Sequence, residues 1–177
     1  MISLNEHASI VYNNIINRRS IRNFKNANID DKTLQLILDA GNAAPSAGNL
    51  KSREILALTT REDIEFVIDY IYSERVKNNL PTFKNAAAII LLLANLQRCR
   101  TKYRRGYLYA IQDATLAGQN MLLMASALGL GGCWVGQIKE AKICAKYNIT
   151  KDFKLVGIIA LGKLPQQNDW EMLQLVI

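Results

Sequence analysis

The stretch "AAAIILLLAN", residues 86–95, decides the fold of this chain of 177 residues. It carries no charge, and its first nine residues are all Ala, Ile or Leu. An apolar run must reach roughly 18 residues before it can span a bilayer, so this run has the length of a strand. A strand that is apolar on both sides must be covered on both sides. We therefore expect residues 86–95 in the middle of a sheet with helices on each face.

The segments around this strand alternate between helical and strand patterns. Apolar residues at helical spacing predict helices at residues 5–17, 28–44, 61–79, 107–131 and 139–149. Strand patterns occupy residues 53–60, 154–164 and, near the C-terminus, 171–177. No repeat, low-complexity stretch or Gly/Ser linker divides the chain, so we predict one domain over residues 1–177. The pattern predicts an α/β or α+β sandwich of helices around a sheet.

The same spacing predicts which helix faces are buried. In the second helix Asp30 is the expected N-cap, and Leu34, Ile37 and Leu38 form the apolar face. The candidate inward positions of residues 5–17 are Ile10, Tyr12, Ile15 and Ile16. Those of residues 107–131 are Leu108, Ile111, Thr115, Gly118, Leu122 and Ala125, widened by Met121, Met124 and Leu128.

Composition excludes several classes of site. The formal net charge of +7 favours an anionic ligand of some kind. His7 is the only histidine, which excludes a His-rich metal site and argues against a Ser-His-Asp triad. Three cysteines without a CxxC pattern are expected to be reduced thiols. The first ten residues lack the pattern of a signal peptide, so we expect a cytoplasmic protein with no membrane partner.

A cluster of arginines in "INRRSIRNF", residues 16–24, is the first candidate site. Arg18, Arg19 and Arg22 surround Ser20 in a segment that is short of acidic residues. Guanidinium forks and a hydroxyl together suit a phosphate. The alternative is a solvated charged face.

Two further stretches are rich in turn-forming residues. "APSAGNL", residues 44–50, offers polar Ser46 and Asn49 beside Pro45 and Gly48, or it is an ordinary loop after a helix. "GLGGCWVGQI", residues 129–138, is not a GxGxxG fingerprint, because its spacing differs and it follows a helix. Gly129 alone would end that helix, and the surplus glycines suggest backbone close to a flat ligand.

Four motifs in order give the chain a family resemblance. "RRSIRNF" (18–24), "APSAGNL" (44–50), "GLGGCWVG" (129–136) and "GIIALGK" (157–163) together resemble the smaller forms of the FMN-dependent nitroreductase family, over about residues 12–165. The resemblance implies an α+β fold, a three-layer α-β-α sandwich whose central, mostly antiparallel sheet is covered by helices on both faces. It also implies an intertwined homodimer with FMN at the interface.

The resemblance also implies the residues that hold the cofactor. The arginine segment would hold the FMN phosphate, with Arg22 leaning towards the N1/O2 side of the ring. The Pro-Ser loop would come from the other subunit, and a backbone N–H near Val135 and Gly136 would bond flavin N5, so no catalytic side chain is expected. The implied cofactor-binding residues are Arg18, Arg19, Ser20, Arg22, Pro45, Ser46, Ala47, Asn49, Trp134, Val135, Gly136 and Lys163.

The chain departs from the family pattern at two of these places. The family often continues Asn-x-Gln-Pro-Trp, whereas residues 49–53 read Asn-Leu-Lys-Ser-Arg. Many members grip the phosphate with a late Lys-x-Arg, but no cation follows Pro165 here, which leaves Lys163 as the candidate.

The implied activity is an FMN-dependent oxidoreductase. It would pass hydride from NADH or NADPH through flavin N5 to a small organic acceptor, such as a nitroaromatic or quinone, by a ping-pong mechanism. Open alternatives are a specialised reaction on the same fold (heterocycle oxidation, dehalogenation or flavin destruction) and a non-catalytic FMN carrier. Residues 98–105, "RCRTKYRR", with nearby tyrosines leave a nucleic-acid-binding module as a less favoured alternative to a solvated connection.

Overall fold

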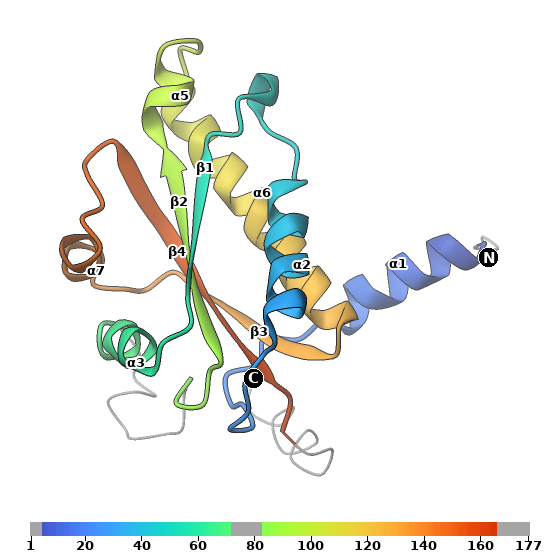
Figure 1. Cartoon of the computed structure of the whole chain (residues 1–177). Coiled ribbons are helices and arrows are strands. Elements are labelled where there is room, and N and C mark those ends of the chain that lie inside the picture. The colour runs from blue at the N-terminus through green and yellow to red at the C-terminus, as the bar shows by residue number, and fades with distance from the viewer. Residues whose placement is uncertain (1–4, 72–82, 166–177) are drawn as a thin grey trace.

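The computed structural model describes residues 5–71 and 83–165 of the chain (Figure 1). In chain order the described elements are α1 (Glu6–Asn17), α2 (Asp31–Asn42), the 3-10 turn η1 (Ala47–Asn49), β1 (Arg53–Leu58), α3 (Arg61–Asp69), β2 (Ala88–Asn95), α5 (Leu96–Arg100), α6 (Gly106–Ala127), β3 (Leu130–Val135), α7 (Glu140–Lys146) and β4 (Phe153–Lys163). Asp30 caps α2 through its side chain, which accepts a hydrogen bond from the Thr33 N–H, as predicted.

The described strands form one sheet in the order β1-β2-β4-β3, and each neighbouring pair is antiparallel. All eight residues of β2 are buried, and β2 lies between β1 and β4. The prediction that residues 86–95 form a covered central strand is therefore confirmed.

Helices cover the sheet on both faces, α2 and α6 on one and α3 and α7 on the other (Figure 1). Alternate residues of β2 serve the two layers. Ile90 and Leu92 belong to the core with α2 and α6, while Ile89 and Leu91 belong to the core with α3 and α7. This three-layer arrangement confirms the predicted α+β sandwich.

The buried face of α6 matches the predicted one at Gly118, Met121, Leu122 and Ala125 and differs elsewhere. Thr115 is exposed, Leu128 lies beyond the helix and is exposed, and Leu108 and Ile111 are only half-buried. The helix ends at Ala127, because Leu130 already pairs in β3. Small residues make up most of the buried face, since they let the helix lie close to the sheet; this face consists of Gly106, Ala110, Asp113, Ala114, Ala117, Gly118, Met121, Leu122 and Ala125.

The predicted inward positions of α1 are wrong for the single chain. Ile10, Tyr12, Ile15 and Ile16 are 45–60% exposed, and α1 buries no residue. Figure 1 shows α1 projecting away from the rest of the molecule. One contact between α1 and the rest of the chain is a hydrogen bond of 3.0 Å that the Asn14 amide donates to the Leu123 carbonyl of α6.

One other predicted helix is shorter than expected. The helix predicted over residues 61–79 ends at Asp69, and Ile71 forms an isolated bridge with Ile138. Residues 72–79 and the strand predicted over 171–177 lie outside the described residues. The basic connection at residues 98–105 begins inside the short helix α5.

Candidate functional site

The arginine segment is held on the sheet by its apolar residues. The Ile21 N–H donates to the Gly132 carbonyl of β3 over 3.1 Å, and Ser20 forms a parallel bridge with Gly132. Ile21 and Phe24 are buried. A Cβ on Gly131 would lie 2.9 Å from Ile21, so that glycine makes room for the segment. Burial of these apolar residues leaves Arg19, Ser20 and Arg22 exposed at the surface.

The three arginines of this segment keep most of their donors available. Arg19 donates to backbone, over 2.7 Å to the Ile16 carbonyl and 3.2 Å to the Arg18 carbonyl. Arg22 donates to the Ser20 carbonyl over a long 3.3 Å. None of the three pairs with a carboxylate within residues 5–71 and 83–165. The segment is therefore a cationic site whose charge no described acid neutralises.

The charges of Arg18 and Arg22 reach the adjacent strand. Burial raises the pKa of the Cys133 thiol in β3, and the positive charges of Arg22 and Arg18 partly oppose that rise. The charge of the arginine segment therefore reaches β3, where Ser20 already bridges Gly132. Lys163 lies at the end of β4, where its carbonyl accepts from the Lys25 N–H over 3.0 Å. The structure thus brings the arginine segment, β3 and Lys163 to one edge of the sheet.

Most of the glycine-rich stretch is the strand β3, which begins at Leu130, inside the helix predicted over residues 107–131. Residues 130–135 pair with β4, and a Cβ on Gly132 would lie 2.8 Å from Leu122. Gly131 and Gly132 therefore make room for side chains of this chain, and their predicted approach to a flat ligand stays a prediction. Gly136 lies exposed just beyond the strand, so only residues 134–136 keep the predicted position.

Trp134 fills a space made by two glycines. Its ring lies 2.3 Å from where a Cβ on Gly118 would be and 2.9 Å from the corresponding point on Gly157. These glycines come from α6 and β4, so the indole ring packs between the helix and the sheet. This packing fixes the backbone of residues 134–136 relative to α6.

The Pro-Ser loop is anchored by a buried carboxylate that sequence reasoning missed. Asp113 of α6 accepts from the Ala47 N–H over 2.9 Å and from the Ser52 N–H over 3.1 Å. The Ser46 hydroxyl accepts from the Lys51 N–H over 2.9 Å. The only sequence signal was a lone acid on the otherwise apolar face of a helix. Asp113 is therefore the residue that sets the shape of this loop.

Arg53 supports the segment that leads into the same loop. It is only 4% exposed, and its Nη2 donates to the carbonyls of Asn42 and Ala44. Its Nε and Nη1 have no hydrogen-bond partner among the described residues. Burial lowers the pKa of Arg53, and the charge of Asp113 opposes that fall. Arg53 is one of the positions that departed from the family pattern, and here it is a buried cation.

A cavity of about 500 Å³ opens beside this loop. It is lined by Pro45, Ser46, Ala47, Tyr109, Gln112, Asp113, Thr115 and Leu116. Asn49 lies in the same loop with a positive φ of 57°. The loop is next to β1, whereas the arginine segment is next to β3 at the opposite edge of the sheet. A single chain therefore does not bring the two halves of the predicted site together.

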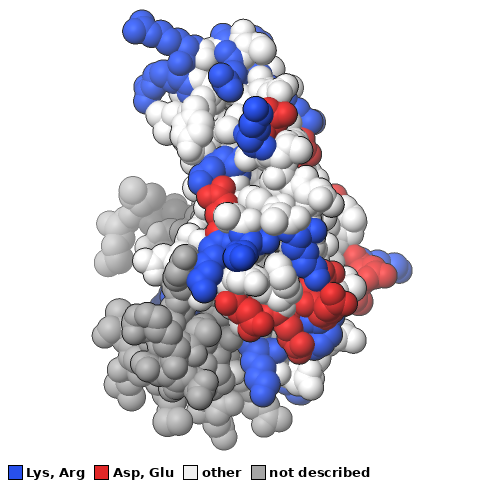
Figure 2. Space-filling view, turned by 90° about the vertical axis from the view of Figure 1, so that its left-hand side faces the viewer, with Lys and Arg blue, Asp and Glu red and all other residues white. Residues whose placement is uncertain are grey.

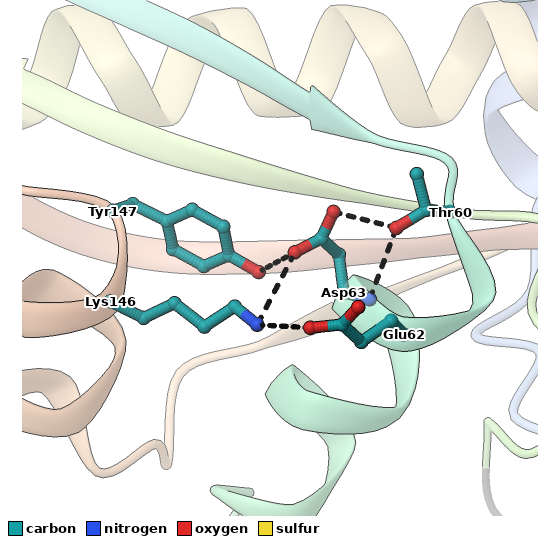
Figure 3. Close-up of polar contacts among 5 residues, drawn as sticks. All are labelled: Thr60, Glu62, Asp63, Lys146 and Tyr147. Carbon is teal, nitrogen blue, oxygen red and sulfur yellow. Dashed lines mark hydrogen bonds and ion pairs between the residues drawn. The ribbon is translucent and has the colours of Figure 1, made fainter.

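A separate polar cluster joins α3 to α7 (Figure 3). The Tyr147 hydroxyl donates to Asp63 over 2.9 Å, and Thr60 donates to the same carboxylate over 2.6 Å. Lys146 pairs with Glu62 at 3.0 Å and with Asp63 at 3.8 Å. The bond from Thr60 and that from Tyr147 lower the pKa of Asp63, while burial and the Asp63 carboxylate raise the pKa of Tyr147. This cluster holds two covering helices together and is not part of the candidate site.

The described residues contain neither a membrane-spanning helix nor a metal cluster. No helix among them is both long and apolar enough to cross a bilayer. No three of their His, Cys, Asp or Glu side chains are grouped as a metal site requires.

Comparisons with known proteins agree on one family. The sequence pattern of the Nitroreductase family matches residues 15–79 and 67–163. A predicted NADH dehydrogenase/NAD(P)H nitroreductase of Archaeoglobus fulgidus is 28% identical over 160 residues, which is 88% of this chain and 86% of that protein.

Solved structures share the fold. A nitroreductase family protein from Clostridium novyi NT superposes with a TM-score of 0.78 at 23% identity, covering 89% of this chain and 87% of that one. The NADPH:FMN oxidoreductase of Vibrio harveyi, solved with NAD+, gives a TM-score of 0.75 at 25% identity, covering 89% of this chain and 70% of that one. These structures confirm the predicted fold class.

Proposed function

This chain belongs to the nitroreductase family, and we propose that it reduces a small organic acceptor with hydride from NADH or NADPH, using FMN held between two copies of itself. Its similarity to the Archaeoglobus NAD(P)H nitroreductase and to the Vibrio NADPH:FMN oxidoreductase supports an NAD(P)H-dependent flavin oxidoreductase. The acceptor class, nitroaromatic or quinone, and the ping-pong order are proposals that rest on the family.

The unpaired arginine segment carries the proposal. Arg18, Arg19 and Arg22 present donors that no described carboxylate occupies, and Ser20 adds an exposed hydroxyl. Such a set fits the dianionic phosphate of FMN through charge-assisted hydrogen bonds. Lys163, exposed at the nearby end of β4, is placed to add a further charge.

The second half of the FMN site comes from the partner chain in this account. Pro45, Ser46, Ala47 and Asn49 lie at the opposite edge of the sheet from the arginine segment, so one chain cannot use both on one flavin. Two chains related by a two-fold axis complete two sites reciprocally. The exposed apolar side chains of α1 supply surface for such a dimer.

The chemistry needs no acid or base from the protein. FMN, when bound, supplies the hydride chemistry at N5. A backbone N–H within Trp134, Val135 and Gly136 would hold the flavin ring, and the packed indole of Trp134 keeps that backbone rigid. Arg22 would add a positive charge that stabilises the anionic, reduced form of the cofactor. The Pro-Ser loop of the partner would complete the binding site.

FMN affinity tests this proposal. Replacing Arg22 by Gln removes one charge-assisted donor, which contributes about 1.5–3 kcal/mol, so FMN should bind roughly 10- to 150-fold more weakly. Lys142→Gln, an exposed cation on α7, makes the same charge change away from the site and should leave FMN affinity unchanged. Equal affinities in the wild type and Arg22→Gln would contradict the phosphate and ring assignment of this segment.

A further inference from the structure

A second cationic surface lies at the start of α6. We define the basic tip as Arg100, Lys102, Arg104 and Arg105, all of which are exposed. No Asp or Glu occurs between residues 96 and 112, and none of the four cations pairs with a carboxylate of the described ranges. Figure 2 shows Lys and Arg side chains gathered at the top of the molecule, the end where Figure 1 places α5 and the start of α6.

The neighbouring Arg98, unlike the four cations of the basic tip, is paired with a described acid. It pairs with Glu54 at 2.7 Å and donates to the Lys51 carbonyl over 2.7 Å. Arg98 therefore has a structural role at the base of the segment. The basic tip has no such partners among the described residues and concentrates four positive charges within six residues. Mutual repulsion in such a cluster is relieved by an anion.

Two tyrosines connect the basic tip to the cavity beside the Pro-Ser loop. Arg105 lies 5.7 Å from the ring centroid of Tyr109, and Lys102 lies 5.9 Å from that of Tyr103. The two rings meet edge to face, with centroids 5.5 Å apart. Tyr109 also lines the cavity of about 500 Å³. Arg105 therefore lies next to a ring that lines the cavity, and Lys102 lies next to the ring that meets it.

Tyr103 also contacts the loop itself. A Cβ on Gly48 would lie 2.2 Å from the Tyr103 hydroxyl, so the ring packs directly on the loop that carries Ser46 and Asn49. A ligand that enters over this loop passes the faces of aromatic rings and then the guanidinium and ammonium groups. That order suits a molecule with a planar group and a distant phosphate.

We propose that the basic tip binds the 2′-phosphate of NADPH and makes NADPH the preferred electron donor. This inference rests on the proposed function, because the nicotinamide end must reach a flavin beside the same loop. NADPH differs from NADH only by the 2′-phosphate, and arginine is the residue that most readily accommodates it. Tyr103 and Tyr109 offer ring surface to the adenine between the cavity and the cations.

A direct binding measurement tests the proposal without turnover. Adenosine 2′,5′-bisphosphate and adenosine 5′-monophosphate, which differ by the 2′-phosphate, are titrated into the holoprotein by calorimetry. The bisphosphate is expected to bind about tenfold more tightly or better, with an advantage that shrinks as salt rises. The variant Arg104→Gln/Arg105→Gln should lose this advantage. The control Lys84→Gln/Lys142→Gln, with the same loss of two exposed charges, should keep it.

The reductive half-reaction gives an independent readout. NADPH should bleach the wild-type flavin at a lower half-saturating concentration than NADH, and the Arg104/Arg105 double variant should raise that concentration for NADPH alone. Equal binding of the two nucleotides to the wild type would overturn the proposal even if both donors bleach the flavin. So would a double variant that loses affinity for a single-stranded oligonucleotide but not for the bisphosphate. A protein that holds no flavin would refute the proposed function instead, and the nucleotide titrations would still decide the role of the basic tip.

Discussion

Asp113 should matter far more than its single carboxyl group suggests, because two backbone N–H groups of the Pro-Ser loop depend on it. Its charge also opposes the fall in the pKa of the buried Arg53. It is itself only 2% exposed. Asp113→Asn keeps the size of the side chain but removes the charge and turns one acceptor into a donor.

The magnitude follows from what remains unpaired. One of the two N–H groups, either of Ala47 or of Ser52, loses its acceptor, and leaving such a group buried costs about 1–3 kcal/mol. Arg53 keeps its two carbonyl acceptors and does not hydrogen-bond Asp113, so the lost charge adds less than a broken ion pair would. We therefore expect Asp113→Asn to lower the free energy of unfolding by roughly 1–3 kcal/mol, a sizeable share of the usual 5–15.

Urea unfolding of the wild type and four variants (Asp113→Asn, Arg53→Met, the double variant and Gln119→Ala) checks this. Gln119→Ala, an exposed position on the same helix, is the control and should change the free energy by less than about 0.5 kcal/mol. The double variant Arg53→Met/Asp113→Asn should cost less than the sum of the two single changes, because it leaves no buried cation without the Asp113 charge. A cost below about 1 kcal/mol for Asp113→Asn, or strict additivity in the double variant, would refute the anchoring argument.

Three further outcomes are expected. Gly118→Ala should destabilise the protein by about 1–3 kcal/mol despite the better helix propensity of Ala, because the new methyl group would lie 2.3 Å from Trp134. Urea unfolding measures the loss of stability, and a shift in indole fluorescence reports the displaced Trp134. A stabilised variant would contradict the packing. Tyr147→Phe should cost about 1 kcal/mol near pH 7. Because the folded state raises the pKa of Tyr147, the wild type should also lose stability as the pH rises above about 10, where an unfolded tyrosine ionises, and Tyr147→Phe should lose less; parallel pH curves would argue against the raised pKa. Mixing Arg22→Gln subunits with Asn49→Ala subunits should restore FMN binding at one of the two sites of each hybrid dimer, and no recovery would count against the shared site.

The central architecture could be predicted from the sequence because its signals are local. An uninterrupted apolar run such as residues 88–94 has few options besides a covered strand. The N-cap at Asp30 and the apolar spacing of Leu34 and Ile37 depend on residues a turn or two apart. Each of these patterns can be recognised from about ten neighbouring residues of the sequence.

The errors arose where distant residues decide the outcome. Glycines disfavour strands on their own, yet Gly131 and Gly132 lie in β3 because Ile21 and Leu122 need their space. The apolar spacing of α1 predicts a buried face, yet those side chains stay exposed in the single chain, because no other described element of the chain covers them. The partners of Asp113 come from residues more than sixty positions away, which no local pattern reveals.

The visible absorption spectrum of the purified protein tests the central claim most directly. It is recorded with added FMN and then, without oxygen, after NADPH and after NADH. The account predicts two flavin bands that remain with the protein through gel filtration and bleach on addition of a nicotinamide donor. A protein that retains no flavin, or whose retained flavin neither donor bleaches, would contradict it.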